Sequence, residues 1–120
     1  MSKQPILYLI HIIECIERIE IYIDELQGKH LLSDRKTYDA ILRNLQVMAE
    51  SSQRLPLEIK NKQPDIEWDN MAGFRNVLMH DYLGDIDEEI VMNVIKDKLP
   101  ELKLAVLQWL PNWQELKKKK

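Results

Sequence analysis

The stretch FRNVLMHDY, residues 74–82, is the part of the chain around which the rest of the sequence is arranged. Plotted on a helix at about 100° per residue, it separates an apolar side from a polar side. The apolar side carries Met71, Phe74, Val77 and Leu78, together with Asp81. The other side carries Arg75, Asn76, Met79 and His80, and Tyr82 returns to the side of Arg75 two turns later. The first side suits a helix packed on a core, whereas the second has more polar groups than packing requires.

Length and composition predict one globular domain. The chain has 120 residues, of which 45% are hydrophobic and 31% charged, and we expect a single helical domain over residues 1–116 with a Lys-rich tail at 117–120. The lone cysteine, Cys15, excludes a disulfide framework and reads as a small core residue, which fits a reducing cytoplasm. The longest apolar run, Ile6 to Ile13, is too short to span a membrane, and no secretory signal precedes it.

The charge balance limits how the protein can meet a polyanion. A formal net charge of −3 argues against a surface that binds nucleic acid all over, so RNA contact would need a local basic patch. The run Lys117–Lys120 is interpreted as a solvated tail. Basic residues elsewhere are candidates for the patch: Arg54, Lys60, Lys62, Arg75, Lys96 and Lys98.

Helical periodicity runs through the whole chain. Apolar residues recur at helical spacing over Pro5 to Gln27, where Gly28 is expected to end the helix and the apolar stripe is formed by Ile12, Ile16, Ile19, Ile23 and Leu26. A second helix is expected to begin at Ser33 or Asp34 and to end near Gln53. These two helices are expected to pair as an antiparallel hairpin. Because no segment alternates like a strand, the sequence predicts an all-α, up-and-down bundle of four to six helices.

Capping residues and prolines place the remaining helices. Asp69 or Asn70 is expected to begin the central helix, with Trp68 just before it, and Gly84 to end it near Tyr82. Asp85 or Asp87 is expected to begin the next helix, and Pro100 to kink or break it, with a last helix starting there. Trp109 and Trp113 are expected to close the end of the bundle.

The polar groups of the central helix suit phosphodiester chemistry. A His that titrates near neutrality can act as general acid or base, and an Arg can stabilise the extra negative charge on a pentavalent phosphorus. Arg75, His80 and a supporting Asn76 could therefore cleave RNA through its 2′-OH without a metal, whereas DNA would resist this route. We expect no metal site and no cofactor, because His and Cys pairs at ligand spacing are missing from the sequence.

Spacing alone does not settle this chemistry. An Arg and a His separated by four residues recur by chance at about one in 400 positions, so the pattern is a weak signal on its own. On that evidence a structural role is favoured, in which Arg75 is a surface group and His80 caps a helix end.

Several stretches together resemble HepT toxins of the HEPN superfamily of helical ribonucleases. Residues 75–82, RNVLMHDY, resemble the Arg-x4-His-x-Tyr signature of these toxins. The stretches IEWD at 66–69, LGDID at 83–87 and LPELK at 99–103 resemble the lead-in, the exit turn and a C-terminal feature of the family, so the likeness covers about residues 4–112.

The resemblance implies a function and partners. It implies a homodimeric endoribonuclease toxin in which Arg75 and His80 are catalytic and Asn76 supports them, at a cleft where the motif helices of two subunits face each other. It also implies that a nucleotidyltransferase antitoxin of the MntA type adds AMP to Tyr82. The added phosphate and bulk would repel RNA from the site. Met79, an apolar residue on the polar side, fits a subunit interface.

Two other classes of protein remain open on the sequence. The first is a HEPN-like dimer that has lost activity and serves only as a binding partner of a nucleotidyltransferase. The second is a plain structural bundle, for which substitution of Arg75 or His80 would change stability or nothing.

Overall fold

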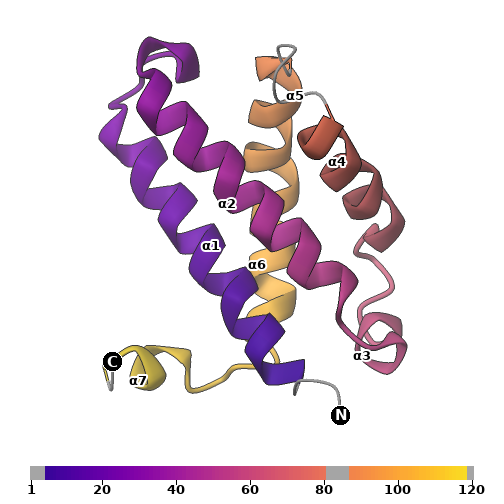
Figure 1. Cartoon of the computed structure of the whole chain (residues 1–120). Coiled ribbons are helices and arrows are strands. Elements are labelled where there is room, and N and C mark those ends of the chain that lie inside the picture. The colour runs from indigo at the N-terminus through magenta and orange to yellow at the C-terminus, as the bar shows by residue number, and fades with distance from the viewer. Residues whose placement is uncertain (1–4, 81–86, 119–120) are drawn as a thin grey trace.

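The computed structural model describes residues 5–80 and 87–118, and for residue 80 the backbone only. Those residues are helical apart from short connections (Figure 1), which confirms the predicted all-α class. None of the helices in these two ranges has the length and apolarity needed to cross a bilayer.

Helices α1 (Pro5–Glu25) and α2 (Arg35–Gln53) form the antiparallel hairpin that the periodicity predicted (Figure 1). Gln27 and Gly28 take left-handed backbone angles, φ 50° and φ 81°, and turn the chain after α1. A short 3₁₀ turn, η1 (Leu31–Ser33), then leads into α2. Asp34 caps α2 by accepting a hydrogen bond from the Thr37 N–H. This bond and a second one from the Thr37 hydroxyl hold the pKa of Asp34 below its ordinary value.

The next segment contains α3 (Leu57–Asn61) and α4 (Trp68–His80), and α4 packs along α2 (Figure 1). Trp68 is the first residue of α4, where it was expected just before the helix. Its indole N–H donates to the carbonyls of Lys60 and Gln63, each at 3.2 Å, and so ties the start of α4 to the end of α3. The predicted caps, Asp69 and Asn70, therefore lie within the first turn.

A long helical run, α5 (Glu88–Asn93), η2 (Val94–Lys98) and α6 (Leu99–Leu107), completes the bundle. Asp87 caps it by accepting from the Glu89 N–H, as predicted. Pro100 lies in the first turn of the last long helix, α6, as predicted. The helical run enters α6 through a π-helical turn, in which the Leu99 N–H donates to the Val94 carbonyl five residues earlier.

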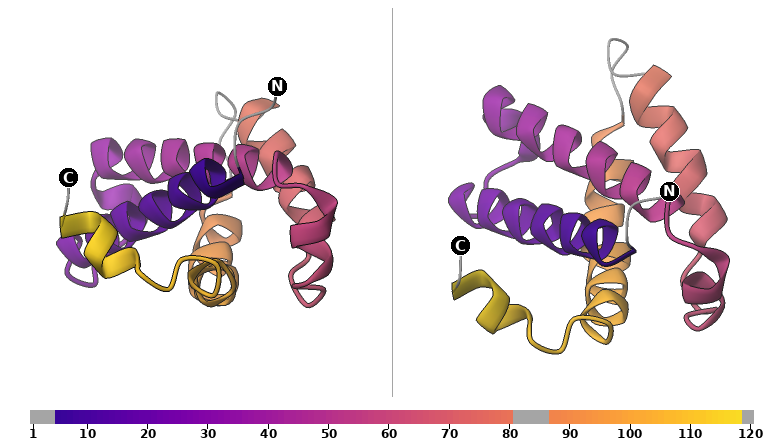
Figure 2. Two further views of the ribbon diagram at one scale, coloured as in Figure 1. Left: turned by 90° about the horizontal axis from the view of Figure 1, so that it is seen from below. Right: turned by 60° about the horizontal axis from the view of Figure 1, so that its bottom comes forward.

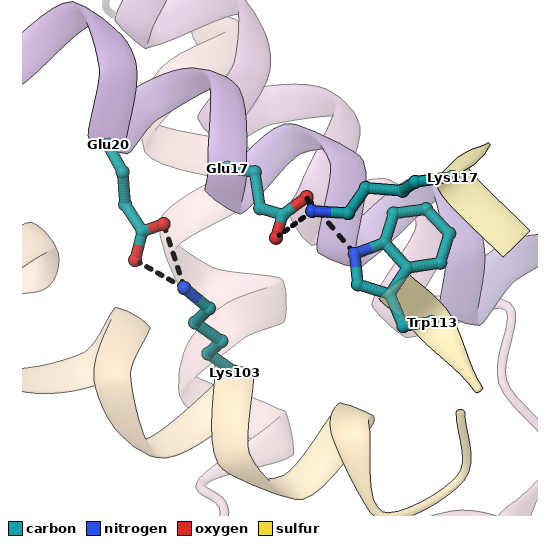
Figure 3. Close-up of polar contacts among 5 residues, drawn as sticks. All are labelled: Glu17, Glu20, Lys103, Trp113 and Lys117. Carbon is teal, nitrogen blue, oxygen red and sulfur yellow. Dashed lines mark hydrogen bonds and ion pairs between the residues drawn. The ribbon is translucent and has the colours of Figure 1, made fainter. Parts of the chain in front are cut away.

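The C-terminal helix α7 (Trp113–Lys118) lies on the α1 side of the bundle, away from α4 (Figure 2). The Trp113 indole N–H and the Lys117 ammonium both donate to the Glu17 carboxylate of α1 (Figure 3). Lys117, interpreted from the sequence as part of a solvated tail, is thus a half-buried residue of a helix. Of the two tryptophans that were expected to close the end of the bundle, Trp113 is buried and Trp109 is half-buried.

One apolar core joins these helices. α1 contributes the predicted isoleucines and Cys15, which is 2% exposed, and burial raises the pKa of that thiol. The fully buried large side chains of the core are Ile12, Ile13, Ile16, Ile19, Ile41, Leu45, Val91 and Val106. α4 contributes Leu78 to this core, so the motif helix is anchored along one side only.

Candidate functional site

The face of α4 that points away from the core is open and mixed in character. Leu78 is buried and Phe74 is half-buried, as predicted for the apolar side. Asn76 is exposed, and so are Val77 at 36% and Met79 at 38%. The placement of Val77 on the core side was wrong, because α2 covers α4 from a direction that leaves Val77 outside. The exposed face therefore combines an amide with apolar side chains, which suits contact with another macromolecule.

Arg75 lies at the edge of this face and is turned towards α2. Its side chain is 27% exposed, and its Nη2 atom is 3.5 Å from Glu50 Oε1. This separation is longer than the 2.7–2.9 Å typical of a charge-assisted hydrogen bond, so the ion pair is a loose one. The Nε atom is buried and has no hydrogen-bond partner within residues 5–80 and 87–118. Arg75 thus keeps an unsatisfied donor, which is uncommon for a buried polar group.

The helix places the two predicted catalytic positions apart within one chain. Residue 80 ends α4, at the end nearest the start of α5 (Figure 1). Five positions along an α-helix correspond to a rotation of about 140°, so residue 80 and Arg75 leave the helix axis in different directions. The side chain of His80 and the whole of Tyr82 lie outside the described atoms. The structure therefore places Arg75 and Asn76 of the predicted site and leaves the other two residues untested.

Three of the basic residues that were candidates for a patch make their contacts away from Arg75. Lys98 pairs with Glu67 at 2.6 Å, and this hydrogen bond lowers the pKa of Glu67 and raises that of Lys98. Lys60 and Lys62 lie at the α3 end of α4, opposite to residue 80, and the Lys62 ammonium stands 5.4 Å from the Trp109 ring centre.

Glu50 is the neighbour that the sequence reasoning missed. It follows Met48 and Ala49, two buried residues of α2, and is itself half-buried. A carboxylate within a core-facing turn of a helix is a signal that could have been noticed. The basic side chain that Glu50 contacts depends on how α2 and α4 cross. The local sequence does not determine this crossing.

The space behind α4 is apolar. A cavity of about 120 Å³ lies between α2, α4 and the η2–α6 run, and its walls include Met48, Met71, Phe74 and Leu102. The lining includes one cation, Lys98, beside the carboxylates of Glu67 and Glu101, whereas a polyanion requires a cluster of cations. In the two described ranges, the acidic, His and Cys side chains form no group of three that could hold a metal ion.

A comparison with models of known protein families identifies the family of this chain. A family model described as "Ribonuclease HepT-like" matches residues 12–108, which include α4 and the motif stretch. The chain belongs to the HepT-like ribonuclease family.

Named relatives agree with this assignment. The chain is 36% identical over 96 residues to the "Probable ribonuclease HepT" of Thermococcus cleftensis, a match that covers 80% of this chain and 86% of the relative. It is 33% identical over 93 residues to a "Putative RNase" of Methanocaldococcus jannaschii, covering 78% and 76%. A third relative, the "Gamma-glutamylcyclotransferase and putative RNase" of the same archaeon, is 32% identical over 120 residues; the chain spans 52% of that protein. No solved structure is significantly similar to this chain.

Proposed function

We propose that this protein is a metal-independent endoribonuclease and the toxin of a toxin–antitoxin pair, with a site made from Arg75 and His80 at the cleft of a homodimer. The observation that carries the proposal is Arg75 itself. It lies within the matched family region, at the border of an exposed face, with a buried Nε–H that has no hydrogen-bond partner among the described residues.

The proposed reaction is transesterification within RNA. The 2′-oxygen attacks the adjacent phosphorus while its proton passes to His80. The bond from phosphorus to the 5′-oxygen then breaks, and that oxygen takes up a proton. Arg75 stabilises the added negative charge on phosphorus, and Asn76 orients the imidazole or the RNA. The products are a 2′,3′-cyclic phosphate and a 5′-hydroxyl end.

A second copy of the chain is part of the proposal. Residues 75 and 80 are rotated by about 140° from each other on one helix, so facing helices are the simpler way to bring Arg and His to one phosphate. The exposed Val77 and Met79 support a contact between copies on this face.

The experiment that tests this function is RNA cleavage by the purified protein in EDTA. We expect cutting with cyclic phosphate ends, and a loss of about 10³-fold or more in Arg75→Ala and in His80→Ala, as for removal of a main catalytic group. A dimer that combines one Arg75→Ala subunit with one His80→Ala subunit should regain up to half of the activity. A strict need for divalent metal would refute the metal-independent route. If wild-type protein leaves RNA intact, an inactive partner of a nucleotidyltransferase becomes the better description.

We also propose that a nucleotidyltransferase antitoxin silences the site by adding AMP to Tyr82. The support is that Tyr82 lies two residues after His80, so an added phosphate would stand beside the groups proposed to bind RNA. Incubation with the partner enzyme and ATP should add the mass of AMP to the intact protein and stop cleavage. Tyr82→Phe should keep cleavage and show no mass change.

A further inference from the structure

We propose that Glu50 is a positioning residue, which fixes the guanidinium of Arg75 for its contact with the phosphate of RNA. This inference rests on the proposed function of Arg75. It begins from the ion pair between Glu50 Oε1 on α2 and Arg75 Nη2 on α4, two helices that pack along each other.

The geometry fits a tether better than a structural ion pair. The Arg75 side chain is held at two points: its Nε atom is buried against the protein, and its Nη2 atom is drawn towards Glu50. An arginine side chain has several rotatable bonds, and an anchor on the guanidinium removes part of that freedom before substrate arrives. A group oriented in advance contributes more to the transition state than a mobile one.

The length of the contact between Glu50 and Arg75 is as important to the proposed role as the contact itself. A bidentate carboxylate at 2.7–2.9 Å would occupy both donors of one guanidinium edge and compete with phosphate. Glu50 instead contacts one nitrogen at 3.5 Å and is 40% exposed. Arg75 can therefore be aimed by Glu50 and still present its remaining donors to a ligand.

The negative charge of Glu50 predicts different changes in KM and in kcat when this residue is replaced. A carboxylate beside the phosphate site repels RNA, so its removal should leave KM unchanged or lower it. Loss of orientation should at the same time lower kcat. A variant that loses general binding would instead raise KM.

The test compares three variants of the full-length protein. Glu50→Ala removes charge and acceptor, and we expect kcat to fall at least about tenfold with KM no higher than in wild type. Glu50→Gln keeps an acceptor oxygen in place and should recover part of that loss. Glu58→Gln, which removes one negative charge from the exposed surface of α3, should behave as wild type.

A second measurement tests the contact between Glu50 and Arg75 in the absence of RNA. The Arg75 Nε–H signal in a ¹H–¹⁵N spectrum, identified by its loss in Arg75→Lys, should exchange slowly with water in wild type because Nε is buried. It should shift and broaden in Glu50→Ala and remain in Glu58→Gln. An unchanged signal in Glu50→Ala overturns the proposal, and so does wild-type kcat in that variant. If wild type itself fails to cut RNA, the proposed function falls, and this spectrum still decides whether Glu50 holds Arg75.

Discussion

Glu17 and Glu50 are both carboxylates that tie two helices together, on opposite sides of the bundle, and their surroundings differ. Glu17 accepts the Trp113 indole N–H at 3.1 Å and the Lys117 ammonium at 3.2 Å, and Lys117 also stands 5.7 Å from the Trp113 ring centre (Figure 3). Glu50 meets Arg75 at one nitrogen, 3.5 Å away, and the Nε donor of that arginine has no partner in the part of the chain that the structure describes.

The difference separates two roles that an ion pair between a carboxylate and a basic side chain has in this protein. At Glu17 the donors of α7 are satisfied within the chain, so this cluster closes the end of the bundle. At Arg75 the described residues leave one buried donor, Nε–H, without a partner, at the edge of an exposed face. A buried donor without a partner costs about 1–3 kcal/mol and calls for an explanation, of which a catalytic role is one. Stability measurements on the two sides should therefore differ in size and in sign.

The largest effect is expected at Trp113. Trp113→Ala removes a large side chain that is 3% exposed and leaves a cavity under α7, so the free energy of unfolding should fall by about 3 kcal/mol. Urea denaturation followed by circular dichroism measures it. Trp109→Ala, at a half-buried position, is the control and should cost less. Equal losses at the two sites would show that α7 does not close the core.

A smaller loss is expected at Glu17. Glu17→Ala leaves the buried Trp113 indole N–H without an acceptor, so the free energy of unfolding should fall by about 2 kcal/mol. The matched control is Glu20→Ala, which breaks an ion pair with Lys103 whose two side chains are 50% and 29% exposed (Figure 3). Such a pair contributes less than about 1 kcal/mol. A larger loss of unfolding free energy in Glu20→Ala than in Glu17→Ala would contradict this prediction.

The smallest effect, with the opposite sign, is expected at Arg75. Arg75→Met keeps the apolar part of the side chain and removes the unpartnered Nε–H, so the free energy of unfolding should stay the same or rise by up to about 1 kcal/mol. RNA cleavage should be lost in the same variant. A stability loss above about 2 kcal/mol would instead make Arg75 a structural residue like Lys117.

The features that local sequence determines were predicted well. The spacing of Ile12, Ile16 and Ile19 gave the buried side of α1, and the side chains of Asp34 and Asp87 begin their helices as expected, because a cap depends only on residues two or three positions away.

The features that depend on how helices cross were not predicted. The direction of Arg75, the exposure of Val77 and the pairing of Lys98 with Glu67 all follow from the placement of α2, α4 and η2 relative to one another. The motif residues could be recognised from the sequence as a set. Their surroundings, including Glu50, needed tertiary structure.

The π-helical turn η2 has a consequence for the alignment of the core. Val91 and Leu99 are eight positions apart and both are buried, at 0% and 3% exposure. In a regular α-helix, eight positions would place them about 80° apart around the axis, whereas seven would leave them about 20° apart. Because η2 takes up one additional residue in a wider turn, the eight-residue interval acts as two ordinary turns. One surplus residue is thereby accommodated within a continuous rod, and the apolar stripes before and after Pro100 stay in line.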